Sequence, residues 1–361
     1  VIGLLTAREL CMAGMKVTLI DRQQTGREAS WAGGGILSPL YPWRYPASVT
    51  SLARWSQATY PGLAALLAAD TGIDPEWSQN GLLILSADID KALHWGELSG
   101  SRVELIDSSS SARIEPELAL TPTEALWLPR IAQIRNPRLV KALRCDLEQR
   151  GVTIVEGIEA RGLLLIGGQA KGVETSNGRI ETEQVVVCAG SWSGQLFGEQ
   201  AVKIPVAPVR GQMILFRTRP RLISRISLYQ GRYIIPRRDG RVLFGSTLEY
   251  TGFDNATSQE ARAELYAKAV SMFPSLKDCP IEKHWAGLRP GSPNGIPFIG
   301  PHPEIEGLYF NTGHFRNGVV LGPASARLLT DIVLQRQPIL SPEPYDLLAD
   351  RGDQSLGLIL P

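Results

Sequence analysis

The first twenty residues constrain the fold of this chain more than any other segment. Apolar residues recur at helical spacing over residues 3–13, and Gly14 stands where a left-handed cap would end that helix. A β-rich run at residues 16–20 follows and is closed by Asp21. This order of helix, glycine, strand and acid predicts the second half of a dinucleotide-binding βαβ unit. In that unit the acid accepts hydrogen bonds from a ribose, and the pyrophosphate rests on the helix amino terminus.

Gly3 would be the third glycine of the G-x-G-x-x-G fingerprint, because Asp21 follows it by 18 positions, close to the ~20 expected. The first strand and the first two glycines of such a unit do not occur in the sequence. Since a central parallel strand is normally buried on both faces, we expect roughly a dozen further residues before Val1 in the natural chain. On this segment alone, an ordinary amphipathic helix followed by a strand is the alternative interpretation.

Three consecutive glycines, Gly33, Gly34 and Gly35, lie in the segment 30–36 that follows the acid. Consecutive glycines are poor in any regular element, so they predict a backbone that approaches a flat or bulky group closely. Ser30 and the neighbouring amides could then reach a phosphate or a ring edge. A flexible loop is the alternative.

A second glycine-rich turn lies near the other end of the chain. Residues 308–311 predict a strand, residues 312–318 a glycine-bounded turn, and the following residues a long helix from about Val319 or Pro323 to about residue 334. Such a helix presents free N–H groups and a positive dipole end to an anion, and reduced flavin carries negative charge at N1 and the C2 carbonyl. This turn therefore favours FAD over NAD. Residues 184–190 predict another parallel strand, with Cys188 as buried filler.

Composition excludes several classes of protein. The chain has 361 residues, 43% of them hydrophobic, which predicts roughly two domains with a real core. Its 37 basic and 36 acidic residues leave a net charge of +1, which argues against a dedicated binder of nucleic acid or membrane surfaces. Four scattered cysteines predict neither zinc nor disulfides, hence no metal and a cytoplasmic location. No apolar stretch reaches the ~18 residues of a membrane span.

Catalytic motifs of hydrolases and metalloenzymes are missing from the sequence. It contains no Ser/His/Asp order and no H-E-x-x-H, and its four histidines share no ligand spacing. This pattern favours an enzyme whose cofactor carries the chemistry while the protein positions the substrate.

Several motifs resemble one family over residues 1 to about 334. They are W-A-G-L-R-P-G at 285–291, G-I-P-F-I-G at 295–300, G-H-F-R-N-G at 313–318, Y-I-I-P-R at 233–237 and G-S-T at 245–247. Together they resemble the D-amino-acid oxidase family of FAD-dependent amine oxidases, and within it the members that oxidise glycine and supply iminoglycine for thiazole formation in thiamine biosynthesis.

The resemblance implies roles for particular side chains. Arg289 would grip the substrate carboxylate, Tyr233 would donate its hydroxyl to the same carboxylate, and Arg316 would line the site near substrate and flavin. Ile36 and Leu248 would take the places of bulky side chains around the small pocket, where relatives tend to have methionine.

The resemblance also implies non-covalent FAD. The residues expected to bind FAD are Val1, Ile2, Gly3, Asp21, Arg22, Ala29, Ser30, Gly34, Gly35, Ile36, Ala160, Gly190, His314, Phe315, Arg316, Asn317, Gly318, Val319 and Val320. The implied fold is α/β, with a Rossmann-like FAD-binding domain around a parallel sheet and a second α+β domain around a largely antiparallel one. Residues 1–75, 137–200 and 284–361 would form the FAD-binding domain, and residues 76–136 and 201–283 the substrate domain. We expect the tail after Pro338 to lie along the surface.

The implied reaction is hydride transfer from the α-carbon of a neutral amine to flavin. Glycine, sarcosine or a small D-amino acid would give an imine and then a 2-oxo acid and ammonia, with oxygen reduced to hydrogen peroxide. Because no base is evident, we expect kcat/KM to rise from neutral to alkaline pH. A dehydrogenase of D-amino acids using a quinone, a tRNA-modifying flavoprotein and a non-catalytic flavin subunit are the alternatives. We expect a homo-oligomer with no nucleic-acid partner.

Overall fold

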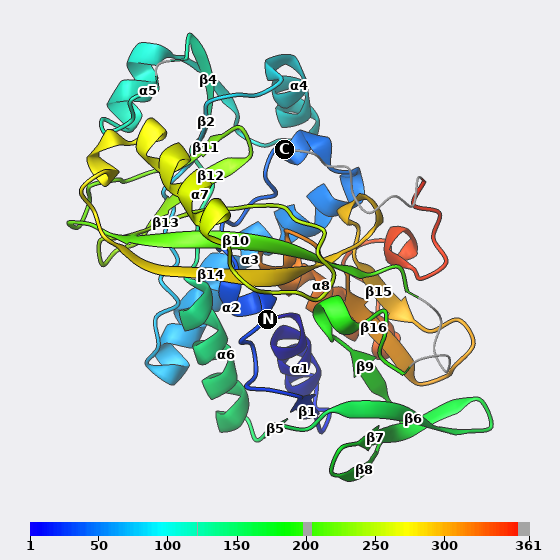
Figure 1. Ribbon diagram of the computed structural model, residues 1–361. Coiled ribbons are helices and arrows are strands. Elements are labelled where there is room, and N and C mark those ends of the chain that lie inside the picture. The colour runs from blue at the N-terminus through cyan, green and yellow to red at the C-terminus, as the bar shows by residue number, and fades with distance from the viewer. Residues whose placement is uncertain (121, 198–203, 353–361) are drawn as a thin grey trace.

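The computed structural model describes residues 1–120, 122–197 and 204–352 (Figure 1). The helices are α1 (Ile2–Met12), α2 (Ala29–Ala32), α3 (Ala47–Thr71), α4 (Ile89–Ser99), α5 (Ser108–Ile114), α6 (Asn136–Gln149), α7 (Gln259–Met272) and α8 (Gly318–Val333). The strands are β1 (Thr18–Asp21), β2 (Leu82–Ile84), β3 (Glu104–Asp107), β4 (Glu124–Leu128), β5 (Thr153–Glu156), β6 (Ala160–Ile166), β7 (Gln169–Thr175), β8 (Gly178–Glu181), β9 (Val185–Val187), β10 (Ala207–Arg217), β11 (Ile226–Tyr229), β12 (Arg232–Pro236), β13 (Arg241–Gly245), β14 (Ile281–Gly291), β15 (Phe298–Pro301) and β16 (Leu308–Thr312).

The amino-terminal prediction is confirmed with a shift at the strand. α1 covers the predicted helix, and Gly14 has a φ of 92°, the left-handed conformation that a glycine adopts without strain. β1 begins at Thr18, two residues later than predicted, and includes Asp21. β1 pairs in parallel with β5, and β16 pairs in parallel with β9. The two parallel pairs are separate sheets, and a cleft lies between β1 and β9.

The other half of the molecule is built on one large sheet. Its strand order is β14-β10-β13-β12-β11-β2-β4-β3, and every pairing is antiparallel except that of β11 with β2. β10 and β14 run together across the middle of the molecule, above α1 and α2 in Figure 1. This pair therefore forms the edge of the large sheet that crosses the middle of the molecule.

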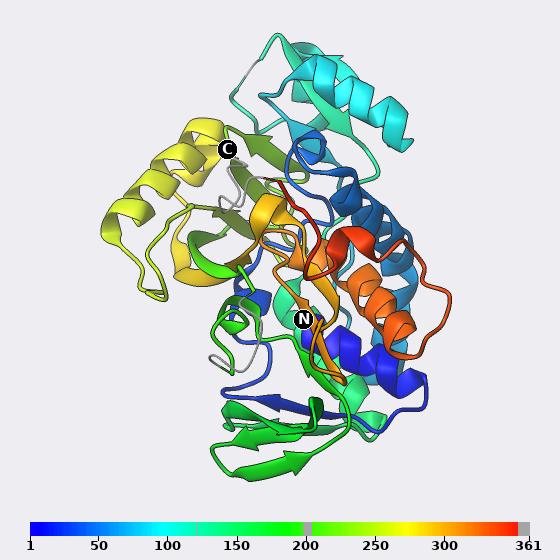
Figure 2. The same ribbon diagram turned by 90° about the vertical axis from the view of Figure 1, so that its right-hand side faces the viewer.

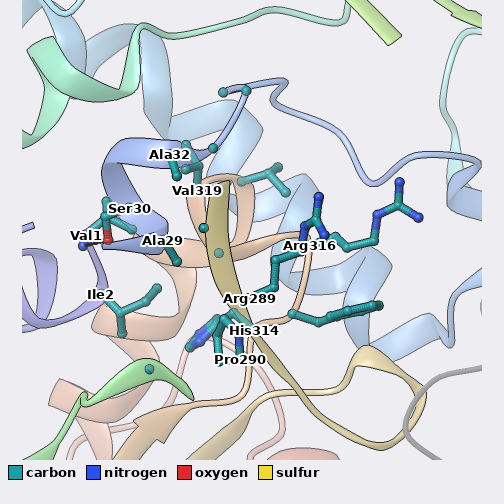
Figure 3. Close-up of a pocket in the computed structure, with 18 of the residues that line it drawn as sticks. Val1, Ile2, Ala29, Ser30, Ala32, Arg289, Pro290, His314, Arg316 and Val319 are labelled. Carbon is teal, nitrogen blue, oxygen red and sulfur yellow. Dashed lines mark hydrogen bonds between the residues drawn. The ribbon is translucent and has the colours of Figure 1, made fainter. Parts of the chain in front are cut away.

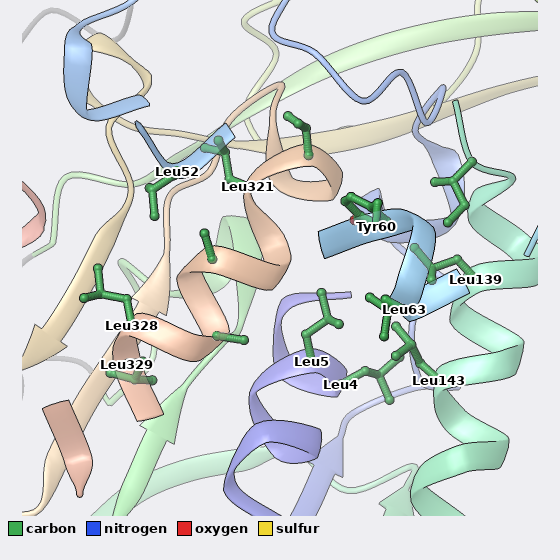
Figure 4. Packing of buried hydrophobic residues seen from close by; sticks show 14 of the residues in the cluster. Leu4, Leu5, Leu52, Tyr60, Leu63, Leu139, Leu143, Leu321, Leu328 and Leu329 are labelled. Atoms are coloured by element: carbon green, nitrogen blue, oxygen red, sulfur yellow. The ribbon is translucent and has the colours of Figure 1, made fainter. Parts of the chain in front are cut away.

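Four helices, α1, α3, α6 and α8, form the main hydrophobic core (Figure 4). Figure 2 shows α1, α3 and α8 side by side on one side of the molecule, with α7 on the opposite side. Gly322 of α8 allows α1 to pack closely against α8, since a Cβ at this position would lie 2.7 Å from Leu5 Cδ1 of α1. Among the described residues, no helix is both long and apolar enough to cross a bilayer.

Helix α8 contains a proline, and α3 compensates for it. Pro323 has no N–H for the Val319 carbonyl one turn earlier, and the Tyr60 hydroxyl of α3 donates to that carbonyl instead. One residue further on, the Ala324 N–H donates to Ser56 Oγ at 2.9 Å. The first turns of α8 are thus held by α3.

The tail after Pro338 follows the surface over most of its described residues, as we expected, and two buried side chains anchor it. Tyr345 is 1% exposed, and its hydroxyl donates to the Ser48 carbonyl at 2.8 Å. Arg351 is also buried and donates to the Ile296 carbonyl at 2.7 Å. The proline and glycine content of the tail indicated irregular structure correctly, but it carried no information about burial.

Candidate functional site

The inner face of the β10–β14 pair presents one side of the site. Residues directly opposite each other on paired strands share a face, as do residues two apart along a strand. The register pairs Gly211 with Gly287 and Met213 with Trp285, so Arg289 lies on the same face as Gly211 and Met213. Tyr233 joins this face through Gly245, which pairs with both Met213 and Tyr233.

Arg289 lies on that inner face with neutral partners only. Its Nη1 donates to the carbonyls of Arg210 (3.3 Å) and Thr247 (3.2 Å), and its Nη2 donates to Ser246 Oγ at 2.6 Å. Among the described residues it forms no ion pair. Burial lowers the pKa of its guanidinium to about 10, and nearby Tyr233 acts in the opposite direction. The group is therefore still a cation at neutral pH, without a carboxylate beside it.

Gly211 makes room for this guanidinium. A Cβ at position 211 would lie 2.1 Å from Arg289 Nη2 and 2.3 Å from Nη1. Across the pair, a Cβ on Gly287 would lie 2.6 Å from the Ala32 Cβ. Gly211 and Gly287 lie opposite each other on the same face, so together they make room there for the arginine and for α2.

Tyr233 is buried beside Arg289, as the motif predicted. Its hydroxyl lies 3.9 Å from Met213 Sδ, a weak contact that leaves it able to donate elsewhere. Ile36, Leu40 and Met213 line the same cavity and supply its apolar wall.

The triple-glycine segment reaches the cavity from the opposite side. A Cβ on Gly34 would lie 2.8 Å from Ile235 Cδ1 and 3.2 Å from Tyr233 Cε2. Gly35 has a φ of 77°, and a Cβ there would lie 2.0 Å from the Ile134 carbonyl oxygen. A Cβ at Gly35 would overlap the Ile134 backbone, and one at Gly34 would force the Ile235 side chain to shift, so both glycines let the backbone come close to its neighbours in the fold.

The second glycine-rich turn brings the amino terminus of α8 to the cavity. Gly318, Val319 and Val320 line it together with His314. His314 Nε2 lies 3.0 Å from Ser325 Oγ of α8, and burial lowers the pKa of this imidazole to about 3. A neutral His314 therefore ties the turn to the helix.

Two open spaces meet at these elements. The inner cavity has a volume of about 170 Å³, and Figure 3 shows Arg289, Arg316, Ser30 and Val319 around it. The outer cleft, of about 970 Å³, lies beside β1 and β9. The residues shared by both linings are Val1, Ala29, Ser30, Cys188 and Gly190. The two spaces therefore adjoin along these residues, an arrangement that suits an extended ligand such as a dinucleotide.

The structure brings most predicted cofactor residues to these spaces. Those that line the inner cavity are Val1, Ile2, Ala29, Ser30, Gly34, Gly35, Ile36, Gly190, His314, Phe315, Arg316, Gly318, Val319 and Val320. Those that line only the outer cleft are Gly3, Asp21, Arg22 and Ala160.

Two predicted residues line neither space. Asn317 is buried at the amino-terminal cap of α8, where its carbonyl accepts from the Leu321 N–H at 2.9 Å. Leu248 is half-buried in the segment after β13, next to Thr247, whose carbonyl accepts from Arg289.

The outer cleft ends at Asp21 and Arg22. Asp21 Oδ1 accepts from the Gln23 N–H at 3.0 Å. The Arg22 guanidinium lies over the Trp192 ring, with Cζ 3.8 Å from the ring centroid. Arg22 and Trp192 thus meet across one end of the cleft, a contact that sequence reasoning missed.

Several other residues of the inner cavity were missed as well. They are Ala32, Gly33, Ser38, Leu40, Gly211, Met213, Gly287, Pro290, Asn311 and Thr312. Gly211 and Met213 alternate with the polar residues Arg210 and Gln212 along β10, so the sequence indicates that they share a face but not which face meets the cavity.

The residues present fit FAD. The Gly34–Gly35 backbone offers a flat approach, and two helix amino termini, of α1 and α8, face the open spaces. Asn311 Oδ1 is buried at the inner cavity and accepts no hydrogen bond from any residue that the structure describes. The Cys188 thiol lies between the two spaces, and burial raises its pKa to about 12, so it stays protonated. Among the described residues, no three acidic, histidine or cysteine side chains cluster as a metal site would require.

Comparisons with known proteins agree with this geometry. The sequence model of the FAD dependent oxidoreductase family, DAO, matches residues 1–332. The glycine oxidase of Pseudomonas aeruginosa is 48% identical over 347 residues, which make up 96% of this chain and 95% of that protein. The bifunctional protein ThiO/ThiG of Trichormus variabilis is 31% identical and covers 94% of this chain, which spans 53% of that protein. The crystal structure of glycine oxidase from Geobacillus kaustophilus has a TM-score of 0.91, at 27% identity, covering 97% of this chain and 96% of that one.

Proposed function

This chain belongs to the DAO family of FAD-dependent oxidoreductases, and from that premise we propose that it is an oxidase of glycine and other small amino acids. Sarcosine and small D-amino acids are the further substrates. The products are a 2-oxo acid, ammonia or an amine, and hydrogen peroxide, with an imine on the way. The imine formed from glycine could serve as a precursor of the thiazole ring of thiamine. The observation that carries the proposal is the uncompensated guanidinium of Arg289.

Arg289 supports a carboxylate substrate by its charge and by its shape. A guanidinium fork binds a carboxylate through two parallel charge-assisted hydrogen bonds, which fix both distance and plane. The neutral partners of Arg289 hold the side chain in place without consuming its charge. The carboxylate of a bound substrate would therefore provide the negative charge that the described protein groups around Arg289 do not provide.

Tyr233 and Arg316 complete the proposed grip. The Tyr233 hydroxyl is buried on the same sheet face as Arg289 and can donate to the same carboxylate. Arg316 lines the cavity and, among the described residues, has no hydrogen-bond or ion-pair partner. We propose that it adds positive charge near the substrate. Ile36, Leu40 and Met213 limit the room beside the α-carbon and so favour small substrates.

FAD supplies the hydride acceptor for the reaction when bound. We propose that the chain holds it through the α1 amino terminus and Asp21 at the outer cleft, and through the Gly34–Gly35 backbone and the α8 amino terminus at the inner cavity. The protein's own part is to orient the amine and to exclude water. Because burial lowers the pKa of His314 to about 3, and its Nε2 lies 3.0 Å from Ser325 Oγ, this imidazole is too weak a base to take the proton of the amine.

Three wider expectations belong to the same proposal. Residues 1–75, 137–200 and 284–361 would bind FAD, and residues 76–136 and 201–283 would shape the substrate side. The placement of Tyr233 and Met213 on the large sheet supports the second set of residues, and β14 of the same sheet spans the boundary between residues 283 and 284. We also propose that the protein is a cytoplasmic homo-oligomer.

Anaerobic bleaching tests the function directly. Glycine added to the yellow protein without oxygen should abolish the visible flavin absorbance, and admitted air should restore it with release of hydrogen peroxide. Bleaching that only a quinone reverses would identify a dehydrogenase instead. Failure of glycine, sarcosine and D-alanine to bleach the flavin would overturn the proposal.

A further inference from the structure

A second arginine is buried behind the site without a carboxylate partner. Arg237 follows β12 and is 9% exposed. Its Nη1 donates to Gln133 Oε1 at 2.6 Å and to the Ile134 carbonyl at 3.1 Å, and its Nη2 donates to the Gly34 carbonyl at 2.7 Å. All three acceptors are neutral.

The acidic side chains nearby pair with a different arginine. Glu76 and Asp239 bind Arg135 Nη1, at 3.1 and 2.9 Å. Arg237 itself forms no ion pair within the described part of the chain. Burial lowers the pKa of Arg237 to about 10, so the group keeps its charge at neutral pH. A buried cation without a direct ion pair is costly to the fold, and the Glu76 and Asp239 carboxylates offset only part of the burial, so its retention calls for a functional reason.

The neutral partners hold this guanidinium firmly. Gln133 is 3% exposed, and its Nε2 donates to Asn80 Oδ1 at 2.9 Å and to the Pro236 carbonyl at 2.8 Å. These two bonds direct the Gln133 oxygen toward Arg237. Both Arg237 and Gln133 lie outside the cavity lining, on the far side of the glycine segment.

The contact with Gly34 determines where the next N–H points. In a trans peptide the carbonyl and the following N–H point in opposite directions. The Gly34 carbonyl points toward Arg237, so the Gly35 N–H points away from it, and Gly35 lines the inner cavity. Within the described residues, the Gly35 N–H has no acceptor, whereas the Gly35 carbonyl accepts from the Ile134 N–H at 2.8 Å.

We propose that Arg237 is a positioning residue for the flavin: its guanidinium orients and polarises the Gly34–Gly35 peptide, so that the Gly35 N–H donates to the flavin ring and the reduced, anionic ring is favoured. This inference rests on the proposed function. A hydrogen bond from a polarised donor is stronger, and a fixed positive charge in a water-poor site stabilises a developing negative one. Removing the charge should therefore make the bound flavin harder to reduce.

The test is the two-electron reduction potential of the FAD-bound protein, measured anaerobically against reference dyes. In Arg237→Gln the equilibrium constant for reduction should fall about tenfold, a shift of ~30 mV for a two-electron couple. Arg237→Lys keeps the charge and should stay within threefold of the wild type. Arg238→Gln is the matched control, because Arg238 is an exposed neighbour that pairs with Asp74, and its potential should equal that of the wild type.

Equal potentials in wild type and Arg237→Gln, with FAD bound in both, would overturn the inference. If Arg237→Gln does not fold, Gln133→Glu replaces it: a carboxylate beside the intact guanidinium compensates its charge, and the potential should fall likewise. An unchanged potential there is again a refutation. The two proposals fail separately, because a wild type that glycine does not bleach refutes the function, whereas a wild type that glycine bleaches leaves only the role of Arg237 in question.

Discussion

The two faces of the β10–β14 pair each carry an arginine, and the chain treats the two differently. On the outer face, Arg210 Nε donates to Glu249 Oε2 at 2.9 Å, and its Nη1 bonds to Asp254 Oδ2 at 2.5 Å. On the inner face, Arg289 meets two carbonyls and the hydroxyl of Ser246. The first guanidinium is neutralised by the fold, and the second is held but left charged.

The pKa directions of the two groups reflect this difference. Although burial opposes it, the Glu249 and Asp254 carboxylates raise the pKa of Arg210 above its ordinary value. Burial lowers the pKa of Arg289 to about 10, since no carboxylate offsets it. The comparison indicates that an arginine satisfied by acids serves the structure, whereas one satisfied only by neutral groups at a cavity is prepared for an anionic ligand.

Arg289→Ala tests the inner face and should have the largest effect. Loss of one partner of a buried charge pair costs about 2–5 kcal/mol, so kcat/KM for glycine should fall on the order of 10³-fold, mainly through KM. Arg289→Lys should lose less, because it keeps the charge but not the fork. FAD content, read from the visible spectrum, should not change. An equal loss of FAD would show that Arg289 serves the cofactor rather than the substrate.

The pH profile distinguishes the charge of Arg289 from its shape. While the substrate amine is mostly protonated, the reactive free base increases about tenfold per pH unit, so kcat/KM should rise on the order of 10²-fold from pH 6 to 8. Above pH ~10, Arg289 loses its proton because burial has lowered its pKa, and kcat/KM should fall again. Initial rates of peroxide release across this range give the profile. A flat profile from pH 6 to 10 would contradict it.

Gly211→Ala sharpens the comparison without touching the charge. The added Cβ would overlap the Arg289 guanidinium, which must move, and a displacement of ~1 Å in a positioning group costs up to about a hundredfold in rate. We expect kcat/KM to fall about ten- to a hundredfold. Gly62→Ala, on an exposed turn of α3, is the control and should leave kcat/KM unchanged, because among the described residues no atom beyond the neighbouring helix backbone lies within 4 Å of a Cβ there. Wild-type activity in Gly211→Ala would show that the Arg289 guanidinium does not lie beside position 211 in the active enzyme.

Arg210→Gln tests the outer face and should have the smallest effect on activity. Without the Arg210 guanidinium, Glu249 keeps Thr247 and Gln212 as hydrogen-bond partners. The free energy of unfolding should therefore fall by about 1–3 kcal/mol, while kcat/KM changes less than tenfold. Chemical denaturation and steady-state kinetics measure the two quantities. A loss of activity as large as that of Arg289→Ala would remove the distinction between the faces.

The site residues differ in how far the sequence could identify them. Arg289, Tyr233 and Arg316 were predicted because each sits in a motif, and the structure brings all three to one cavity. Met213 was missed because a methionine in a strand carries no functional signal of its own. Leu248 was predicted by resemblance but lies outside the cavity lining, since β13 ends at Gly245 and the facing of later residues no longer follows from alternation.

Arg237 also shows that contacts between segments distant in sequence could not be predicted from the sequence. Its motif was visible, yet its bonds reach the Gly34 carbonyl and Gln133, some 200 and 100 positions away in the chain. Likewise, a proline within the predicted helix gave no indication that Tyr60 would satisfy the Val319 carbonyl. Contacts of this kind depend on which helices and strands become neighbours after folding.

The amino-acid order alone determined the local elements: the α1–Gly14–β1 sequence, the two glycine-rich turns and the alternation along β10. Hydrogen bonds and side-chain periodicity within such elements join near neighbours, so they can be read from short stretches. Tertiary structure decided which face of β10 meets the cavity and which arginines lack acids. Those outcomes depend on strand register and on burial among segments distant in sequence, because a charge is compensated only by groups that folding brings within reach.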